Sequence, residues 1–326
     1  MLPERFTEPS GFQWGSFTSP SGYMARCGSI GPEGTARGTI IIATGFRECI
    51  EKYFEVIRDM TTRGFAVHIM DWPGQGGSER LDKTNPQKMH CLGYDSQIAT
   101  LDAFAKGVSE HATQPLILCA HSMGAHIGLR YLKEHPGVFD SAILSAPMMD
   151  VTTGKIPRLA ARLIVAFAHA VGLGKKYKPD GHDWSDRDRV FEGNSLTSDP
   201  NRFNVMADIY RCNPNMRMGD ATYGWAHHTF CSIATLHKKG YLQSIKTPIL
   251  MQISGDERIV DPAAAPRAAK ILPQCRSITI PQARHEIWME RDDLRQQWLS
   301  EVDGFLATHL RGPEHGSKTT PRPPQL

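Results

Sequence analysis

Short apolar segments rich in β-branched residues alternate along this chain with segments of helical periodicity, which restricts the folds open to it. The expected strands cover residues 38–43, 64–71, 115–120, 139–145, 247–253 and 277–280. Helical patterns lie between them at about 48–63, 95–111, 123–133, 262–271 and 289–310. Strands connected by helices form βαβ units, so we predict an α/β fold with a mostly parallel central sheet flanked by helices. The Gly- and Ser-rich residues 11–42 alternate as hairpin strands do.

The alternation is interrupted once, between Met149 and Thr247. Residues 150–240 are helical or irregular in pattern and rich in Arg, His, Asn and Met. We therefore expect a core domain built from residues 10–149 and 241–310, with an inserted helical cap at 150–240. The tail 311–326 holds four prolines and few apolar residues, so we expect it to be disordered.

The segment Ala120-His-Ser-Met-Gly124 lies between an expected buried strand and an expected helix. A serine in a tight strand-to-helix turn presents its hydroxyl above the sheet, and small residues on either side let the turn close. The same turn directs the Met123 N–H and the helix N-terminus at a developing oxyanion. We interpret Ser122 as a nucleophile. The alternative is that it only caps the helix.

A serine nucleophile in such a turn is followed along the chain first by an acid and then by a histidine. His285 follows the expected strand 277–280, where a loop can reach Ser122, so we predict that it is the general base. The acid should follow the strand 247–253, where Asp256 and Glu257 both qualify. We favour Glu257, which stands two residues before Ile259, and keep Asp256 as the alternative.

The loop after the first buried strand is the expected source of a second oxyanion donor. Gly45 allows close approach of the backbone, and Phe46 can offer its N–H; the alternative is an ordinary turn. The Gly-rich stretch 71–78 is neither a phosphate-binding loop nor a dinucleotide fingerprint, so we interpret it as structural. No motif of the spacing that binds zinc occurs, and we expect neither a metal nor another cofactor.

These motifs resemble the bacterial lysophospholipases and their monoglyceride-lipase relatives, which are serine hydrolases of the α/β-hydrolase fold. The resemblance covers about residues 10–310 and is carried by Gly45-Phe46 with Glu48 and Tyr53, Asp71-Trp-Pro-Gly-Gln-Gly, Ala120-His-Ser-Met-Gly124, Ser145-Ala-Pro147, His285-Glu286, and residues 194–203 and 221–225 of the cap. It implies a triad of Ser122, acid and His285, an oxyanion hole at Phe46 and Met123, and monoacyl lipid substrates. Thr44 and Ala120 depart from the His and Gly that are usual at these places.

Residues 156–171 have helical periodicity, with an apolar stripe formed by Leu159, Leu163, Ile164, Phe167 and Val171. We expect this cap helix to pack over the core domain. The alternative is a lid that rests on a lipid surface. Aromatic residues of the cap, Tyr223, Trp225 and Phe167, are the candidates for binding the substrate.

The composition limits which binding partners and which cellular compartment we expect for this protein. The net charge of +3 is small, and Lys and Arg are scattered, so we expect no nucleic acid partner. Seven cysteines without a CxxC pair are typical of free thiols in a reducing compartment. The sequence shows no secretory signal and no apolar run of about 18 residues, so we expect a cytoplasmic protein. Peripheral contact with the inner membrane through the cap remains open, as does the oligomeric state.

Two alternatives remain at this stage. An aminopeptidase or a small-ester esterase would use the same triad, and a peptidase would need an acidic group in the cap, such as Asp186, Asp188 or Glu192. A binding protein without catalytic activity is the alternative from a different class.

Overall fold

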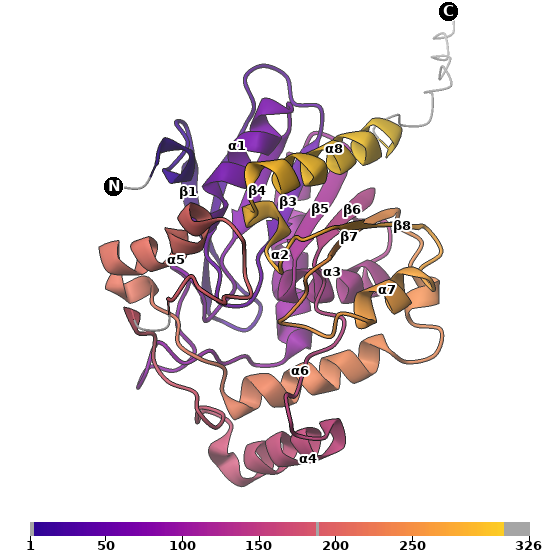
Figure 1. The fold of residues 1–326 in the computed structure, drawn as a ribbon. Coiled ribbons are helices and arrows are strands. Elements are labelled where there is room, and N and C mark those ends of the chain that lie inside the picture. The colour runs from indigo at the N-terminus through magenta and orange to yellow at the C-terminus, as the bar shows by residue number, and fades with distance from the viewer. Residues whose placement is uncertain (1–2, 187–188, 310–326) are drawn as a thin grey trace, which may run out of the picture.

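The computed structural model describes residues 3–186 and 189–309, and its centre is an eight-stranded sheet (Figure 1). The strand order is β1-β2-β4-β3-β5-β6-β7-β8. The strands from β3 to β8 run parallel, whereas β2 pairs antiparallel with both β1 and β4. Their bounds are β1 Gln13–Thr18, β2 Met24–Ile30, β3 Thr39–Ala43, β4 Ala66–Met70, β5 Leu116–His121, β6 Ser141–Ser145, β7 Ile249–Ser254 and β8 Cys275–Ile280. The prediction of a mostly parallel α/β sheet is confirmed.

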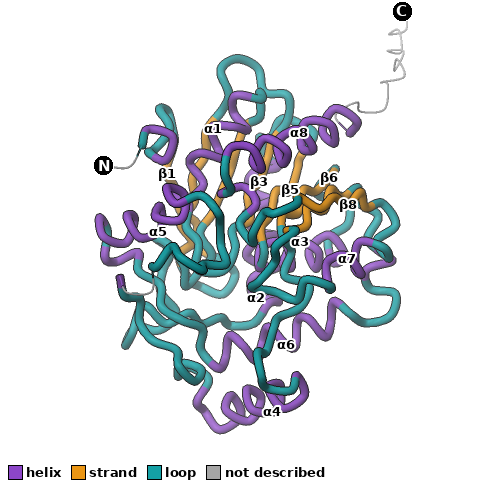
Figure 2. The backbone as a smooth tube through the Cα atoms, in the orientation of Figure 1, coloured by secondary structure: helices purple, strands orange, loops and turns teal. Residues whose placement is uncertain are grey.

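Helices cover both faces of the sheet (Figure 2). Their bounds are α1 Phe54–Thr62, α2 Tyr94–Ser109, α3 Met123–Glu134, α4 Arg158–Ala168, α5 Pro200–Cys212, α6 Tyr223–Leu236, α7 Ala264–Ala269 and α8 Asp292–His309. Shorter helices are η1 Glu4–Phe6, η2 Ile50–Tyr53, η3 His169–Leu173, η5 Pro214–Met216, η6 Leu242–Ser244 and η7 Ile287–Met289. The predicted tail 311–326 lies outside the described residues.

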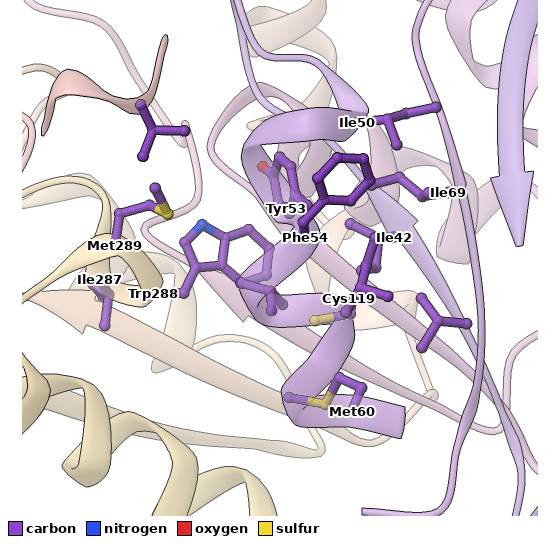
Figure 3. Packing of buried hydrophobic residues seen from close by; sticks show 14 of the residues in the cluster. Ile42, Ile50, Tyr53, Phe54, Met60, Ile69, Cys119, Ile287, Trp288 and Met289 are labelled. Atoms are coloured by element: carbon purple, nitrogen blue, oxygen red, sulfur yellow. The ribbon is translucent and has the colours of Figure 1, made fainter. Parts of the chain in front are cut away.

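The alternation of side chains along each strand divides the core into two layers. On β5, Ile117 and Cys119 join a cluster that includes residues of α1 and α8, whereas Leu118 joins a cluster that includes residues of α2, α3 and α7. Figure 3 shows part of the first cluster, in which Trp288 and Tyr53 pack edge to face at a centroid distance of 5.1 Å. Because both faces are covered, all residues of β3, β5, β6 and β7 are buried.

The chain between β6 and β7 forms α4, α5 and α6. The helix α4 packs on α6 and is the outermost of these helices in Figure 1. Only Val165 and Ala168 of α4 are buried. The expectation that its apolar stripe packs over the core is therefore wrong: Leu159, Leu163 and Phe167 are 67%, 62% and 70% exposed. The helix α4 contacts α6 with one face, and the row that carries these three residues points away from α6.

Candidate active site

Ser122 occupies a strained turn between β5 and α3. Its φ of 49° and ψ of −112° lie in a region that residues other than glycine rarely adopt. The turn is held because the Ser122 N–H donates to the Ser145 carbonyl at 3.0 Å. Gly124 allows the start of α3 to lie close to the end of β3, since a Cβ at that position would overlap the carbonyl oxygens of Ala43 and Thr44. The Ser122 hydroxyl therefore lies at the carboxyl end of the parallel strands, on a turn that can form because residue 124 is a glycine.

The imidazole of His285 lies beside this hydroxyl. His285 Nε2 is 2.8 Å from Ser122 Oγ, and its Nδ1 is 2.8 Å from Glu257 Oε2. Ser122 and His285 are only 6% and 3% exposed, so the pair is shielded from bulk water. The three groups stand in the order hydroxyl, imidazole, carboxylate that transfers a proton from the hydroxyl to the ring.

The structure distinguishes the two candidate acids. Glu257 Oε1 accepts the backbone N–H groups of Ile259 at 2.8 Å and Val260 at 3.2 Å, which leaves Oε2 for His285. Burial favours a higher pKa for Glu257, but the bond to His285 and these two N–H groups outweigh it and lower the pKa. Asp256 instead forms two bonds with Arg258, at 2.8 and 2.6 Å. Of these two acids, Glu257 is the one that hydrogen bonds to the His285 imidazole.

The two backbone N–H groups predicted to hold an oxyanion lie at the start of α3 and on the loop after β3. Met123 is the first residue of α3, so its N–H has no partner within the helix. Phe46 lies on the loop after β3, and the residues on either side of it are fixed: Gln75 donates to the Gly45 carbonyl at 3.0 Å and accepts the Arg47 N–H at 2.9 Å. The Gly-rich stretch 71–78, interpreted as structural, therefore supports the loop that carries Phe46.

A buried network of charges lies behind this loop. Glu48 accepts from the Gly45 N–H and the Tyr53 hydroxyl, and its other oxygen is 2.7 Å from Lys52 Nζ. Lys52 also reaches Glu286 at 2.6 Å. Burial would raise the pKa of Glu48, but Lys52 and His121 outweigh it and hold the pKa well below its usual range. The sequence indicated Glu48 and Glu286 only through the family resemblance, because a bond between Lys52 and a residue 234 positions away leaves no local pattern.

A cavity of about 320 Å³ opens at Ser122. The described residues that line it are Phe46, Arg47, Glu48, Lys52, His121, Ser122, Trp184, Arg189, Leu196, Met206, Tyr210, Ile259, His285 and Glu286. One part of the wall is apolar, and another part carries charge. The apolar part comes largely from residues 184–210 of the expected cap.

The comparisons with known proteins agree with this geometry. The family described as "Serine aminopeptidase, S33" matches residues 34–292, which is most of the chain. The chain belongs to this family. Within it, the chain falls with the lysophospholipase-like and monoglyceride-lipase-like α/β-hydrolases.

The relatives named in these comparisons cover most of the chain. It is 30% identical over 280 residues to a probable lysophospholipase L2 of Haemophilus influenzae, covering 85% of this chain and 86% of the relative. It is 29% identical over 287 residues to lysophospholipase L2 of Escherichia coli, covering 83% and 80%. A soluble variant of monoglyceride lipase from Saccharomyces cerevisiae superposes with a TM-score of 0.69 at 18% identity, covering 94% of this chain and 99% of that one, which shows a shared fold.

The residues predicted to bind the substrate of this α/β-hydrolase lie apart from the lining of the cavity at Ser122. Tyr223, Trp225 and Phe167 are absent from the described residues that line the cavity. Trp225 packs against the Phe46 ring at a centroid distance of 4.4 Å, one layer away, and Phe167 is largely exposed. The aromatic residues that the chain between β6 and β7 contributes to the cavity lining are Trp184 and Tyr210, which lie in a loop and in a helix without a strong amphipathic pattern.

The loop that carries His285 is bound to the insertion between β6 and β7. The Glu286 N–H donates to the Leu196 carbonyl at 2.8 Å, and the Thr197 hydroxyl donates to the Met289 carbonyl at 2.6 Å. Arg284 adds a bond to the Thr197 carbonyl at 2.8 Å. The position of the imidazole therefore depends on residues 196–197, which the sequence indicated only as part of the family resemblance.

Within residues 3–186 and 189–309, no cluster of His, Cys, Asp and Glu has the arrangement of a metal site. None of the helices in this part of the chain combines the length and the apolarity needed to span a bilayer. The seven cysteines are free thiols.

Proposed function

We propose that the chain is a serine hydrolase that cleaves the carboxylic ester of monoacyl lipids, as a lysophospholipase or a monoacylglycerol lipase. The observation that carries the proposal is the hydrogen-bonded series Ser122, His285 and Glu257. It lies at the mouth of a cavity that is partly apolar, in a family that includes relatives named lysophospholipase L2 and monoacylglycerol lipase.

The mechanism follows from these contacts. The Ser122 hydroxyl attacks the ester carbonyl while His285 Nε2 accepts its proton, and Glu257 stabilises the charged imidazole. The N–H groups of Phe46 and Met123 stabilise the oxyanion, each contributing about 10²–10³-fold to the rate. His285 then protonates the leaving alcohol. Water attacks the acyl-enzyme in a second round, with the same base, and releases the fatty acid.

The acyl chain has an apolar wall to bind. Trp184, Met206 and Tyr210 of the insertion line the cavity, and Met206 can adapt to a flexible chain. Leu196 and Ile259 extend this surface beside His285. We treat residues 150–240 as a cap over a core of residues 10–149 and 241–310, since this segment supplies much of the wall.

We further propose that the cap contacts a lipid surface through α4 and η3. Large apolar side chains are exposed along this segment, namely Ile156, Leu159, Leu163, Ile164, Phe167, Val171 and Leu173. Arg162 is exposed on the same helix. An exposed apolar row beside a cation is typical of a helix that lies in a membrane interface. Such contact would bring the cavity close to lipid substrates and is compatible with a cytoplasmic enzyme that binds the inner membrane peripherally.

The alternatives have less support. A peptidase would hold the substrate amine with a free carboxylate of the cap. Asp186 is instead paired with Arg211 at 2.7 Å, Glu192 is exposed, and Asp188 lies outside the described residues. A binding protein without activity does not require a hydroxyl, an imidazole and a carboxylate at 2.8 Å spacing.

The test combines labelling with a substrate panel. A fluorophosphonate probe is expected to modify Ser122 of the purified protein, located by peptide mass spectrometry. The panel contains lysophospholipids, monoacylglycerol, short p-nitrophenyl esters and aminoacyl amides. Hydrolysis of the monoacyl lipids supports the proposal. Activity on the amides alone would replace it with the peptidase, and activity on the short esters alone would remove the lipid assignment.

A further inference from the structure

Arg189 is a cation of the cavity wall that forms no ion pair with the described residues. It lines the same cavity as Ser122 and His285. One terminal nitrogen donates to the Phe203 carbonyl at 3.0 Å, and the guanidinium stacks over the Phe203 ring at 4.7 Å. Its Nε is buried without a hydrogen-bond partner, and no described carboxylate forms an ion pair with it. A half-buried guanidinium without an ion-pair partner is costly, so a structural role alone gives little reason for one.

The other charges of the wall already have partners. Lys52 lies between Glu48 and Glu286, at 2.7 and 2.6 Å. Arg47, which follows Phe46 directly, pairs with Asp220 at 3.1 Å. Lys52 thus offsets one of the two carboxylates, and Arg189 is the lysine or arginine of the described wall that has no ion-pair partner.

We propose that Arg189 binds the phosphate of a lysophospholipid headgroup, with Arg47 as a second cation at the same end of the cavity. This inference rests on the proposed function and narrows it to phosphate-bearing substrates. The glycerol backbone alone separates the scissile ester from the phosphate, so an ester held at Ser122 brings the phosphate within the same cavity. Arginine donors match phosphate oxygens in geometry and charge. A monoacylglycerol offers only hydroxyl groups there and leaves the guanidinium unpaired.

The first measurement compares two substrates with the same acyl chain, 1-oleoyl lysophosphatidylethanolamine and 1-oleoylglycerol. The ratio of their kcat/KM values is expected to fall about 10- to 100-fold in Arg189→Gln, the usual effect of losing a charged hydrogen bond. Arg189→Lys should keep part of the ratio, since it keeps the charge. Arg211→Gln is the matched control, because this cap arginine is paired with Asp186 away from the cavity, and its ratio should equal that of the wild type. Thermal unfolding of each variant shows that it is folded.

The second measurement does not depend on activity. In calorimetric titration, the wild type is expected to bind sn-glycerol 3-phosphate but not glycerol. The affinity of Arg189→Gln for sn-glycerol 3-phosphate should be at least about 10-fold lower. Equal losses on both substrates, or an unchanged ratio with unchanged titrations, would overturn the inference while the proposed function stands. A wild type that binds glycerol 3-phosphate through Arg189 but hydrolyses neither lipid would overturn the proposed function and keep the anion site.

Discussion

Nε2 of His285 lies 2.8 Å from the Ser122 hydroxyl, although 163 positions separate the two residues along the chain. The sheet produces this proximity. Ser122 follows β5 and His285 follows β8, and both strands belong to the parallel part of the sheet, so their carboxyl ends meet at one edge. Ligands and reacting groups in open α/β sheets concentrate at that edge.

The contact between Glu257 and His285 predicts different outcomes for the two neighbouring acids. Glu257→Gln should lower kcat on a p-nitrophenyl ester by about 10³- to 10⁴-fold, because the amide no longer stabilises the charged imidazole or fixes its tautomer. Asp256→Asn is the control. It loses an exposed pair with Arg258 and a longer one of 3.9 Å with Arg284, and it should change kcat by less than about 3-fold. Similar losses in both variants would contradict the assignment of the acid.

The turn at Ser122 predicts that Gly124 tolerates no side chain. Gly124→Ala places a methyl group against the Ala43 and Thr44 carbonyl oxygens and should cost about 1–3 kcal/mol in the free energy of unfolding, or prevent folding. Gly107→Ala is the control, since this glycine lies in α2 with open space around it and alanine favours a helix. Urea denaturation measures both. A Gly124→Ala protein as stable as the wild type would show that the turn is less tight than described.

His126 predicts a pH dependence of stability. Its Nδ1 is 2.9 Å from the Met148 carbonyl and its Nε2 is 2.7 Å from the Ser232 hydroxyl, so the buried ring is a neutral donor and acceptor. Burial lowers its pKa to about 3. The unfolded chain binds a proton there near pH 6.5 and the folded chain does not, so stability should fall as pH decreases below 6.5.

The measurement is the free energy of unfolding between pH 7 and pH 5. His126 should contribute up to about 1.4 kcal/mol per pH unit, and His126→Gln should remove that slope although it lowers stability at pH 7. His111→Gln, at an exposed histidine, is the matched control. Equal slopes in the wild type and in His126→Gln would count against the neutral ring.

The exposed row on α4 predicts binding to lipid. The double variant Leu163→Ser and Phe167→Ser removes two side chains that are 62% and 70% exposed, so it should keep the fold and reduce sedimentation with anionic vesicles by at least about 10-fold. Ile271→Ser, at a residue 42% exposed on another part of the surface, is the control. Vesicle binding that is equal in all three proteins would place the lipid contact elsewhere.

The sequence was informative where function depends on local pattern. Ser122 and His285 each follow a strand of the parallel sheet, and the order along the chain then limits the acid to one short loop. Alternation of apolar segments also predicted the parallel sheet, because each central strand is buried on both faces and carries an unmistakable run such as Ile40 to Ile42.

The packing of residues 150–240 was harder to predict, because these residues contact parts of the protein that are distant in the sequence. The apolar stripe of α4 has a helical period, but this period does not determine which face of the helix packs against another element. In the structure Phe167 of this stripe is exposed. Trp184 and Arg189 enter the cavity from irregular segments that have no periodicity. The salt bridge between Lys52 and Glu286 likewise exists only once the chain is folded.

Release of oleate from lysophosphatidylethanolamine and from monooleoylglycerol, compared between the wild type and Ser122→Ala, tests the central claim most directly. We expect steady release by the wild type and a loss of several orders of magnitude in the variant, with the fold unchanged by circular dichroism. Turnover by Ser122→Ala near that of the wild type, or a wild type that releases no fatty acid from either lipid, would contradict the account.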